Sequence, residues 1–274
     1  MKEMNSDDIK KVSVEILKYI DNVCRINNIR YYLCAGTLLG AIRHGGYIPW
    51  DDDIDIMLFR EDFEKLSLVW PKDGNYILLS SDNTKKFPYA YNKIIDTRTM
   101  KIEPIRNQYQ VIGVDVDVFP LDNFPDSEKE SIAFIKTIRK EQKKRDRCIL
   151  QYSKSSSPLR TVKNYIYSII YGFYNFIEPN LIRRVVKKMQ TNAQRYNDIK
   201  TNYCGITTLY HYGMGERYPK EYFRGSVLVT FEGEQYPAPI EYNDYLRHMY
   251  GDDYLQLPPV EKRNTHHSYK AYWK

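Results

Sequence analysis

The chain has few cysteines, and they are not arranged in pairs. Cys24, Cys34, Cys148 and Cys204 lie far apart among 274 residues and show no Cys-x-x-Cys spacing. This excludes the disulfide scaffold of small secreted domains, and no zinc site with the usual ligand spacing is present. The cysteine usage therefore predicts a cytoplasmic protein.

Long hydrophobic runs are missing as well. No segment reaches the roughly 20 uninterrupted apolar residues of a membrane-spanning helix. The charged N-terminus has neither an apolar signal core nor a small-residue cleavage site, so we expect no export. Internal repeats and low-complexity tracts are also absent, and the length suits one catalytic unit with appendages.

Neither sign of charge is in large excess. The 41 lysines and arginines face 35 acidic residues, which gives a formal net charge of +6. Such a balance is compatible with nucleic acid, anionic lipid or a phosphorylated substrate as partner. Tyrosine, in contrast, is abundant at 26 residues, and its amphipathic side chain suits wet surfaces.

The most informative segment covers residues 36–56, GTLLGAIRHGGYIPWDDDIDI, and places four aspartates in five positions. Asp53 and Asp55 alternate with Ile54 and Ile56, and side chains two apart on a strand project from the same face. Two carboxylates held so close repel each other unless a cation lies between them, and hard oxygen ligands select Mg²⁺ or Mn²⁺. The alternative is a solvated acidic turn, which needs neither the isoleucines nor the glycine-rich unit.

The residues before the aspartates predict a turn, a short helix and a stiff return. Gly36 and Thr37 open the turn, and a short buried helix follows whose first amide groups can face an anion. Gly45 and Gly46 end this helix. Pro49 then restricts the path into the aspartate strand, so a helix start and a carboxylate pair are expected close together.

A second acidic strand is predicted over residues 111–121, where valines alternate with Asp115 and Asp117 and Pro120 ends the run. Taken alone, an edge strand with its aspartates in water shows the same pattern. Two acidic strands in one sheet, however, supply three or four carboxylates to a single metal centre, as phosphoryl-transfer sites require.

Periodicity predicts the remaining elements. Residues 6–27 should form a packing helix with Ser6 as its N-cap, and residues 153–158 a polar linker. Further helices are expected over residues 61–69, 127–151 and 162–177 and shortly before Tyr250, and strands over residues 29–35, 54–59, 76–79, 91–95, 203–209 and 227–236.

The predicted helix over residues 162–177 is aromatic, apolar and too short to span a bilayer. A helix at an anionic membrane surface carries flanking cations and tyrosines at headgroup depth, which predicts a peripheral membrane contact. A helix buried in the fold, or a dimer contact, explains the pattern equally well. The flanking cations are Arg160, Lys163, Arg183, Arg184, Lys187 and Lys188.

The aspartate motif, the later DVFPLD and the C-terminal YGDDYLQLPPVEKR together resemble the LicD family of phosphocholine transferases, to which the fukutin-related enzymes are more distantly similar. The resemblance spans most of the chain. It implies an α/β (α+β) fold with a nucleotidyltransferase-like mixed sheet flanked by helices and an additional helical segment. We expect a catalytic core over residues 1–125, a helical segment over 126–200, and strands and a helix over 201–274 that complete the active-site region.

The resemblance also implies an activity. It is the metal-dependent transfer of phosphocholine from CDP-choline to a sugar hydroxyl of a cell-surface glycan precursor, of the teichoic acid or lipopolysaccharide type. The acceptor would be lipid-linked at the inner face of the plasma membrane, with the enzyme cytoplasmic or peripheral there. Transfer of another phospho-substituent from a CDP-alditol, and a nucleotidyltransferase acting on nucleotide or nucleic acid, are the alternatives. A non-catalytic scaffold would lack a carboxylate of the site.

By position in the family motif, Asp53 and Asp55 match the paired metal-binding aspartates, Asp51 the first aspartate, and Asp117 the later strand aspartate. Asp115 is a further candidate. We expect Mg²⁺ or Mn²⁺ on Asp53, Asp55 and Asp117, with Asp117 completing the coordination or taking the proton of the attacking hydroxyl.

Donor-phosphate contacts are expected from cationic and hydroxyl side chains, because an arginine fork fits phosphate. For four of these, Lys93, Arg98, Arg263 and His266, an ordinary surface role is the alternative. A choline headgroup would bind aromatic faces, for which the tyrosines offer many candidates. No nucleic-acid partner is expected, since the basic residues do not alternate with aromatics along a groove. The donor-binding candidates are Thr37, Arg43, Lys93, Arg98, Arg263 and His266.

Overall fold

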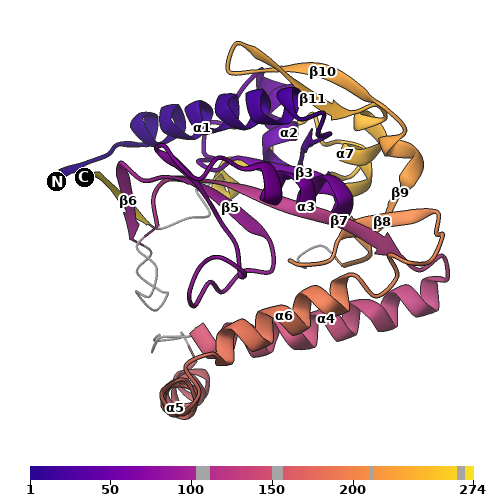
Figure 1. Ribbon diagram of the computed structural model, residues 1–274. Coiled ribbons are helices and arrows are strands. Elements are labelled where there is room, and N and C mark those ends of the chain that lie inside the picture. Colours follow the sequence, from indigo (N-terminus) through magenta and orange to yellow (C-terminus); the bar gives the residue numbers. More distant parts are fainter. Residues whose placement is uncertain (103–111, 150–156, 210–212, 264–268) are drawn as a thin grey trace.

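The computed structural model describes residues 1–102, 112–149, 157–209, 213–263 and 269–274 and has a mixed α/β architecture. Helices α1 and α3 lie on one side of a mixed sheet, and α4 and α6 lie on the other (Figure 1). Helix α5 is set apart at the end of the α4–α6 pair. The predicted fold class, a mixed sheet flanked by helices with an additional helical segment, is therefore confirmed.

The central sheet has the strand order β2-β3-β7-β5-β4. Strands β3 and β7 are parallel, and their register places Asp55 opposite Asp117, whereas the other neighbours are antiparallel. The two acidic strands predicted from the sequence are thus direct neighbours. The strands are β2 (Tyr32–Leu33), β3 (Asp55–Phe59), β4 (Tyr76–Leu79), β5 (Asn92–Asp96) and β7 (Asp115–Phe124), extended by β8 (Tyr203–Ile206) and β9 (Tyr218–Pro219).

Pro120 does not end β7, contrary to the prediction. The strand continues to Phe124 because its neighbour changes at this point: β5 pairs with it only as far as Val118, and β8 joins from Leu121. Pro120 therefore lies between the part of β7 that pairs with β5 and the part that pairs with β8. No neighbouring strand on that edge needs a hydrogen bond from the N–H that proline lacks.

Helices α1 (Ser6–Ile26), α2 (Ala35–His44) and α3 (Arg60–Val69) were predicted to within a few residues. The N-cap of α1 is Asn5 and not Ser6 as predicted. The Asn5 side chain accepts a 2.8 Å hydrogen bond from the Asp8 amide, and the Asp8 carboxylate accepts one from the Asn5 amide. The helix α2 ends at Gly45, as predicted, and Gly45 adopts the left-handed conformation there with φ 70°.

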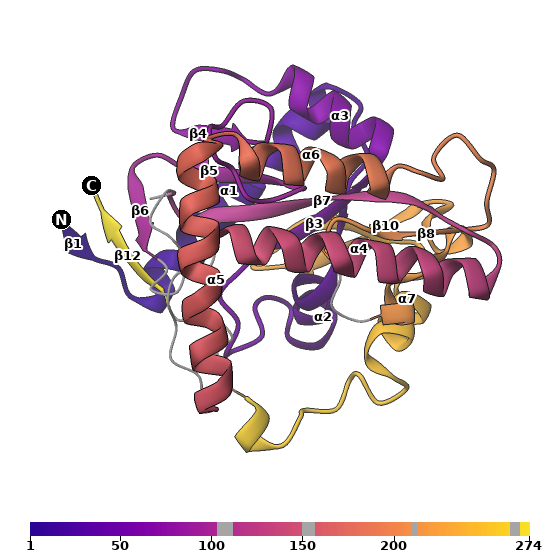
Figure 2. The ribbon, with the colours of Figure 1, turned by 90° about the horizontal axis from the view of Figure 1, so that it is seen from below.

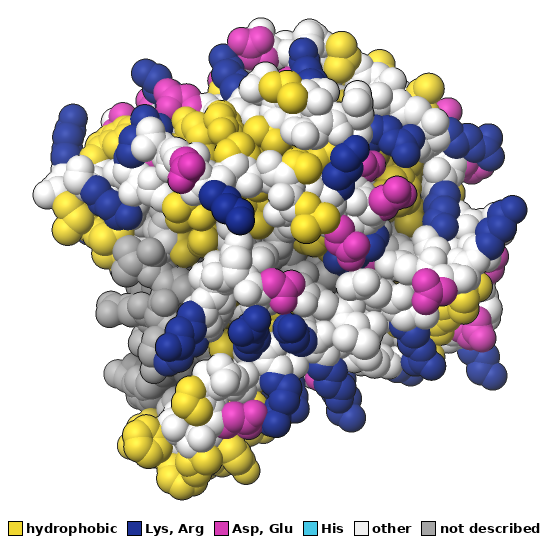
Figure 3. All heavy atoms as spheres, in the orientation of Figure 1, with side chains coloured by type: hydrophobic (Ala, Val, Ile, Leu, Met, Phe, Trp, Pro, Cys, Tyr) yellow, Lys and Arg dark blue, Asp and Glu magenta, His cyan; other side chains and the backbone are white. Residues whose placement is uncertain are grey.

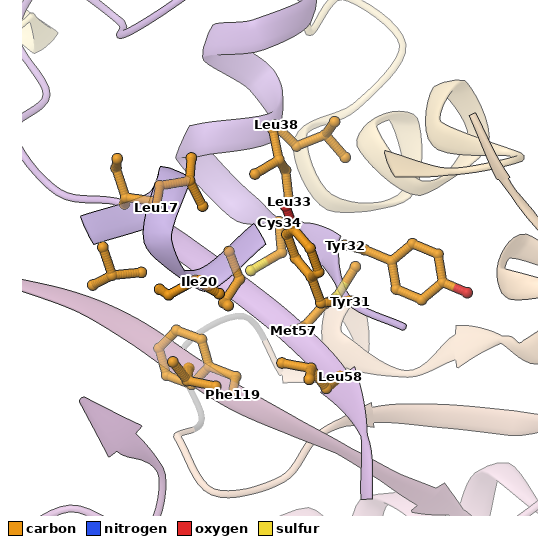
Figure 4. Packing of buried hydrophobic residues seen from close by; sticks show 14 of the residues in the cluster. Leu17, Ile20, Tyr31, Tyr32, Leu33, Cys34, Leu38, Met57, Leu58 and Phe119 are labelled. Carbon is orange, nitrogen blue, oxygen red and sulfur yellow. The ribbon is translucent and has the colours of Figure 1, made fainter. Parts of the chain in front are cut away.

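A hydrophobic core packed against β3 and β7 holds these elements together. Leu17 and Ile20 of α1, Leu38 of α2, Leu58 of β3 and Phe119 of β7 belong to this core (Figure 4). Because these side chains are almost completely buried, the start of α2 and the starts of β3 and β7 are held in a rigid relation.

Helices α4 (Glu128–Ile149) and α6 (Leu181–Ala193) lie side by side, and α5 (Pro158–Ile177) crosses their ends (Figure 2). Helix α6 is an element that was not predicted separately within the expected helical segment. Its apolar face buries Val185, Val186 and Met189 in a small cluster with Cys148 of α4. In the described part of the chain, no helix has the length and apolar character to cross a membrane.

Two smaller sheets complete the fold. Strands β1 (Lys2–Glu3), β12 (Lys270–Trp273) and β6 (Thr99–Ile102) bring the two termini together (Figure 1). The strand region predicted over residues 227–236, with Gly233 as a turn residue, is a hairpin of β10 (Ser226–Phe231) and β11 (Glu234–Pro239), and Gly233, at φ 80°, lies in its turn as predicted. The 3-10 turns η1 (Gly213–Glu216) and η2 (Lys220–Phe223) precede this hairpin in the sequence. Helix α7 (Tyr242–Tyr250) and the 3-10 turn η3 (Val260–Lys262) follow it.

The division of the chain into three domains stays a prediction.

Candidate active site

A cavity of about 1540 Å³ opens beside the first residues of β3 and β7. The start of α2, strand β5, helix α4, helix α7 and the segment 253–263 also contribute to its wall. All five aspartates singled out in the sequence line it. They are Asp51, Asp53, Asp55, Asp115 and Asp117.

The start of α2 positions two of these aspartates. A Cβ added at Gly36 would lie 2.7 Å from the Asp51 carboxylate, so only glycine lets Asp51 approach the helix so closely. The Thr37 hydroxyl accepts a 2.8 Å hydrogen bond from the Asp55 amide. Thr37 is buried and does not itself line the cavity within the described residues. The structure therefore places Thr37 behind the aspartates, and a donor contact from it stays a prediction.

The aspartates of the first strand repel one another. Asp51, Asp52 and Asp53 each offer a carboxylate oxygen within 4.8 Å of the other two. Burial, and then the neighbouring Asp53, raise the pKa of Asp51 to about 8. Burial, followed by Asp53 and Asp117, raises the pKa of Asp55 well above its usual range. These carboxylates could hold a hard divalent cation, which would remove the repulsion.

Two lysines neutralise the second acidic strand. The buried Lys93 forms ion pairs with both Asp115 and Asp117, and the Lys101 ammonium lies 2.6 Å from the other oxygen of Asp115. Burial alone would raise the pKa of Asp115, but Lys101 and Lys93 outweigh it and lower that pKa. For Asp117 burial prevails over Lys93, and its pKa rises to about 6. Asp117, opposite Asp55, is thus the less neutralised of the two.

The predicted cationic residues divide between the cavity and other surfaces. Arg43 lines the cavity and donates to the carbonyls of Tyr254 and Gln256 at 3.2 and 3.1 Å. Arg263 also lines it, donates to the Pro258 carbonyl at 2.7 Å and lies 5.6 Å from the Trp50 ring centroid. Both arginines therefore tie the segment 254–263 to the cavity wall.

Of the other two candidates, Arg98 pairs with Asp96, is about half-exposed and does not line the described cavity wall. His266 lies outside the described residues. The structure therefore brings Arg43, Lys93 and Arg263 to the aspartates, but not Arg98.

Sequence reasoning missed one charged residue of the cavity wall in particular. Arg145 of α4 is 5% exposed, donates to the Pro88 carbonyl at 3.4 Å, and its Nε has no hydrogen-bond partner among the described residues. The run KEQKKRDR, residues 140–147, is typical of a solvated helix face and hides the role of Arg145. The signal is nevertheless in the sequence, because Arg145 continues the helical spacing of Phe134 and Ile138, which are buried. The same cavity is also lined by Lys101, Trp50, Tyr250 and Tyr269, which no sequence pattern marks as site residues.

The structure thus brings together paired acidic strands, a short helix that ends at a glycine and a cavity lined by basic residues. In agreement, residues 28–152 match the family model described as LicD/FKTN/FKRP, nucleotidyltransferase domain. The matched part, less than half of the chain, is therefore similar to the nucleotidyltransferase domain of that family, as the resemblance implied.

Individual relatives extend this result. The chain is 29% identical over 276 residues to the lipopolysaccharide cholinephosphotransferase LicD of Haemophilus influenzae, covering 99% of each protein. It is 46% identical over 48 residues to the human ribitol 5-phosphate transferase FKRP, 18% of this chain and 10% of that protein. It is 43% identical over 58 residues to an uncharacterised protein of Rickettsia prowazekii, 21% and 22% of the two chains. The chain is thus similar over 99% of its length to a cholinephosphotransferase, in agreement with the predicted resemblance.

Proposed function

We propose that this chain transfers phosphocholine from CDP-choline to a sugar hydroxyl of a cell-surface glycan precursor. The observation that carries the proposal is the convergence of Asp53, Asp55 and Asp117 on one cavity whose wall also holds Arg43 and Arg263. The full-length similarity to a lipopolysaccharide cholinephosphotransferase supports phosphocholine as the group transferred.

The candidate metal ligands fit the implied metal ion, because every one of them is a carboxylate oxygen. Asp53 and Asp55 would hold Mg²⁺, or Mn²⁺, with Asp51 and Asp117 beside them. When bound, the ion supplies positive charge that neutralises the donor diphosphate and stabilises CMP as the leaving group.

The role of Asp117 in this reaction is to accept the proton of the acceptor hydroxyl. In the reaction a bond forms between the sugar oxygen and the phosphorus next to choline, and the bond from that phosphorus to CMP breaks. With its pKa raised to about 6, the Asp117 carboxylate is ionised at neutral pH and still basic enough to accept the hydroxyl proton. Lys93, which pairs with this carboxylate, keeps it directed into the cavity.

Aromatic side chains of the cavity wall suit the cationic headgroup. Trp50, Tyr250 and Tyr269 line the cavity and are partly exposed. Two of these rings already receive a cation: Arg263 lies over Trp50, and the Lys101 ammonium is 4.5 Å from the Tyr269 ring centroid. Ring faces in this wall are therefore oriented to attract a quaternary ammonium group.

Calorimetric titration with CDP-choline, CDP-ribitol, CDP-glycerol and CTP, each with and without Mg²⁺, tests the proposal. We expect Mg²⁺-dependent binding that is tightest for CDP-choline, and CMP release when a glycan acceptor is added. Tighter binding of CDP-ribitol would favour the second candidate function, transfer of a phospho-substituent from a CDP-alditol. The short match with the ribitol 5-phosphate transferase points to that alternative. Absence of nucleotide binding would overturn the proposed function altogether.

A further inference from the structure

Helix α5 carries its hydrophobic side chains on its outer face. The exposed fractions of Ile166, Ile169 and Phe173 are 50%, 56% and 63%. These positions are three or four residues apart and therefore form one stripe along the helix. The whole stripe consists of Leu159, Val162, Tyr165, Ile166, Ile169, Ile170, Phe173, Phe176 and Ile177.

The opposite face of α5 is the one that contacts the protein. Its partly covered positions, Thr161, Asn164, Tyr167, Ser168 and Tyr171, recur at helical spacing, and three of them carry small polar side chains. The helix contacts α4 and α6, where Tyr171 packs on the cluster around Cys148 (Figure 2). A helix that packs on a core does the reverse and turns its apolar face inward. The outward apolar stripe of α5 thus needs another apolar medium.

Cations surround this stripe. The 20 residues of α5 contain no aspartate or glutamate, but they include the exposed Arg160 and Lys163. The first two turns of α6, next along the chain, add Arg183, Arg184, Lys187 and Lys188, all exposed. Figure 3 shows hydrophobic side chains at the lower left, where Figure 1 places α5, with several basic side chains above them.

The carboxylates of the described residues balance only some of these charges. Glu178 pairs with Arg184, Asp82 with Lys187 and Glu141 with Lys188, whereas no described carboxylate pairs with Arg160, Lys163 or Arg183. The surface is therefore apolar at its centre and cationic at its margin.

We propose that α5 lies flat on an anionic lipid bilayer, with its apolar stripe at the acyl boundary and its neighbouring cations among the headgroups. An interfacial helix combines these two features, since apolar burial and attraction to anionic lipid add together. A second copy of the chain fits less well. A two-fold contact through α5 would bring the same cations face to face, where they repel. The inference rests on this surface alone and not on the proposed activity.

Flotation of the purified full-length chain with lipid vesicles tests the proposal. We expect binding to vesicles of phosphatidylcholine mixed with phosphatidylglycerol, weaker binding to phosphatidylcholine alone, and release at high salt. The double substitution Ile169→Glu and Phe173→Glu should lower binding about tenfold or more, because it puts two charges into the apolar stripe. Leu68→Glu on α3 is the matched control, since Leu68 is also apolar and 84% exposed.

Three results would overturn the proposal. One is a wild-type chain that binds neither kind of vesicle, and another is binding that the double substitution leaves unchanged. The third is a wild-type dimer in light scattering that the double substitution converts to a monomer, without vesicle binding, which would make α5 a contact between copies. Titration of the double variant with CDP-choline should match the wild type, so a failure here is distinct from a failure of the proposed function.

Discussion

Gly36 illustrates how a single residue limits the geometry of the site. Any side chain there would meet the Asp51 carboxylate, which is free to swing away because it ends a flexible side chain. We therefore expect Gly36→Ala to keep the fold but displace Asp51, and to lower the transfer rate about 10²-fold. Steady-state kinetics measure this. Gly172→Ala, in exposed α5 with nothing within 4 Å of the added Cβ, should leave the rate unchanged.

Asp53 and Asp55 are the carboxylates on which the metal site is proposed to depend. Asp53→Asn and Asp55→Asn should each abolish transfer while the thermal midpoint stays equal or rises, because each removes a ligand and also relieves carboxylate repulsion. CMP release and thermal unfolding are the measurements. Asp73→Asn in an exposed turn serves as the control, and normal turnover in either site variant would contradict the mechanism.

Arg145 is predicted to bind an anionic group of a substrate. It is buried in the cavity wall, and its Nε has no protein partner among the described residues. Arg145→Met removes a charge-assisted hydrogen bond of about 1.5–3 kcal/mol, which corresponds to a loss of affinity of roughly tenfold to a hundredfold. Calorimetry with donor and acceptor would identify the ligand affected. Lys140→Met, at an exposed cation of the same helix, should bind normally, and equal behaviour of the two variants would refute the prediction.

At the scale of elements, β7 is connected to α3 by a buried ion pair. Arg60, the first residue of α3, donates to both oxygens of Asp122 at 2.8 and 2.6 Å, and Asp122 also accepts from Asn197 and Thr207. Arg60→Met leaves the Asp122 carboxylate buried without its counter-ion. We expect the free energy of unfolding to fall by about 3 kcal/mol in urea denaturation.

The matched control for this ion pair is Arg25→Met. Arg25 pairs with Asp21 at 2.8 Å, but its side chain is 65% exposed, so the loss should be within about 1 kcal/mol. If the two arginine substitutions cost the same, the Arg60 pair does not stabilise the junction of α3 and β7.

Periodicity identified most elements, and the errors have separate physical causes. Helix α1 and strand β4 follow their patterns closely because each buries one face against the core. The pattern of β7 was misinterpreted at Pro120 because a proline ends a strand only where a neighbour needs its N–H, and the neighbours are far away in sequence. Strands β1, β6 and β12 depend on pairing between segments that lie far apart in the sequence, which local pattern does not reveal.

At the scale of the whole molecule, the carboxylate cluster couples stability to pH. The pKa values of Asp51 and Asp117 are raised to about 8 and about 6, whereas an aspartate in the unfolded chain titrates near about 3.9. The folded state therefore binds more protons than the unfolded state between about pH 4 and pH 8, so stability falls as pH rises through this window. The lowered pKa of Asp115 has the opposite effect, but only below about pH 4.

We accordingly expect the metal-free chain to have a lower thermal midpoint at about pH 8 than at about pH 5, and Mg²⁺ to raise the midpoint more at the higher pH. Differential scanning calorimetry with EDTA or Mg²⁺ measures both. Asp51→Asn should flatten the pH dependence of the metal-free chain. A midpoint that is independent of pH in the wild type would show that the cluster does not carry this repulsion.

The sequence by itself determined the chemistry of the candidate site, because the alternation of aspartates with isoleucines and valines on two strands fixes which side chains share a face. Only the tertiary structure decided which strands are neighbours, that two lysines neutralise Asp115, and that Arg145 faces the same cavity. It also decided that the apolar face of α5 points outward. The physical reason is that local pattern depends on residues a few positions apart, whereas pairing, counter-ions and exposure depend on segments that meet only after folding.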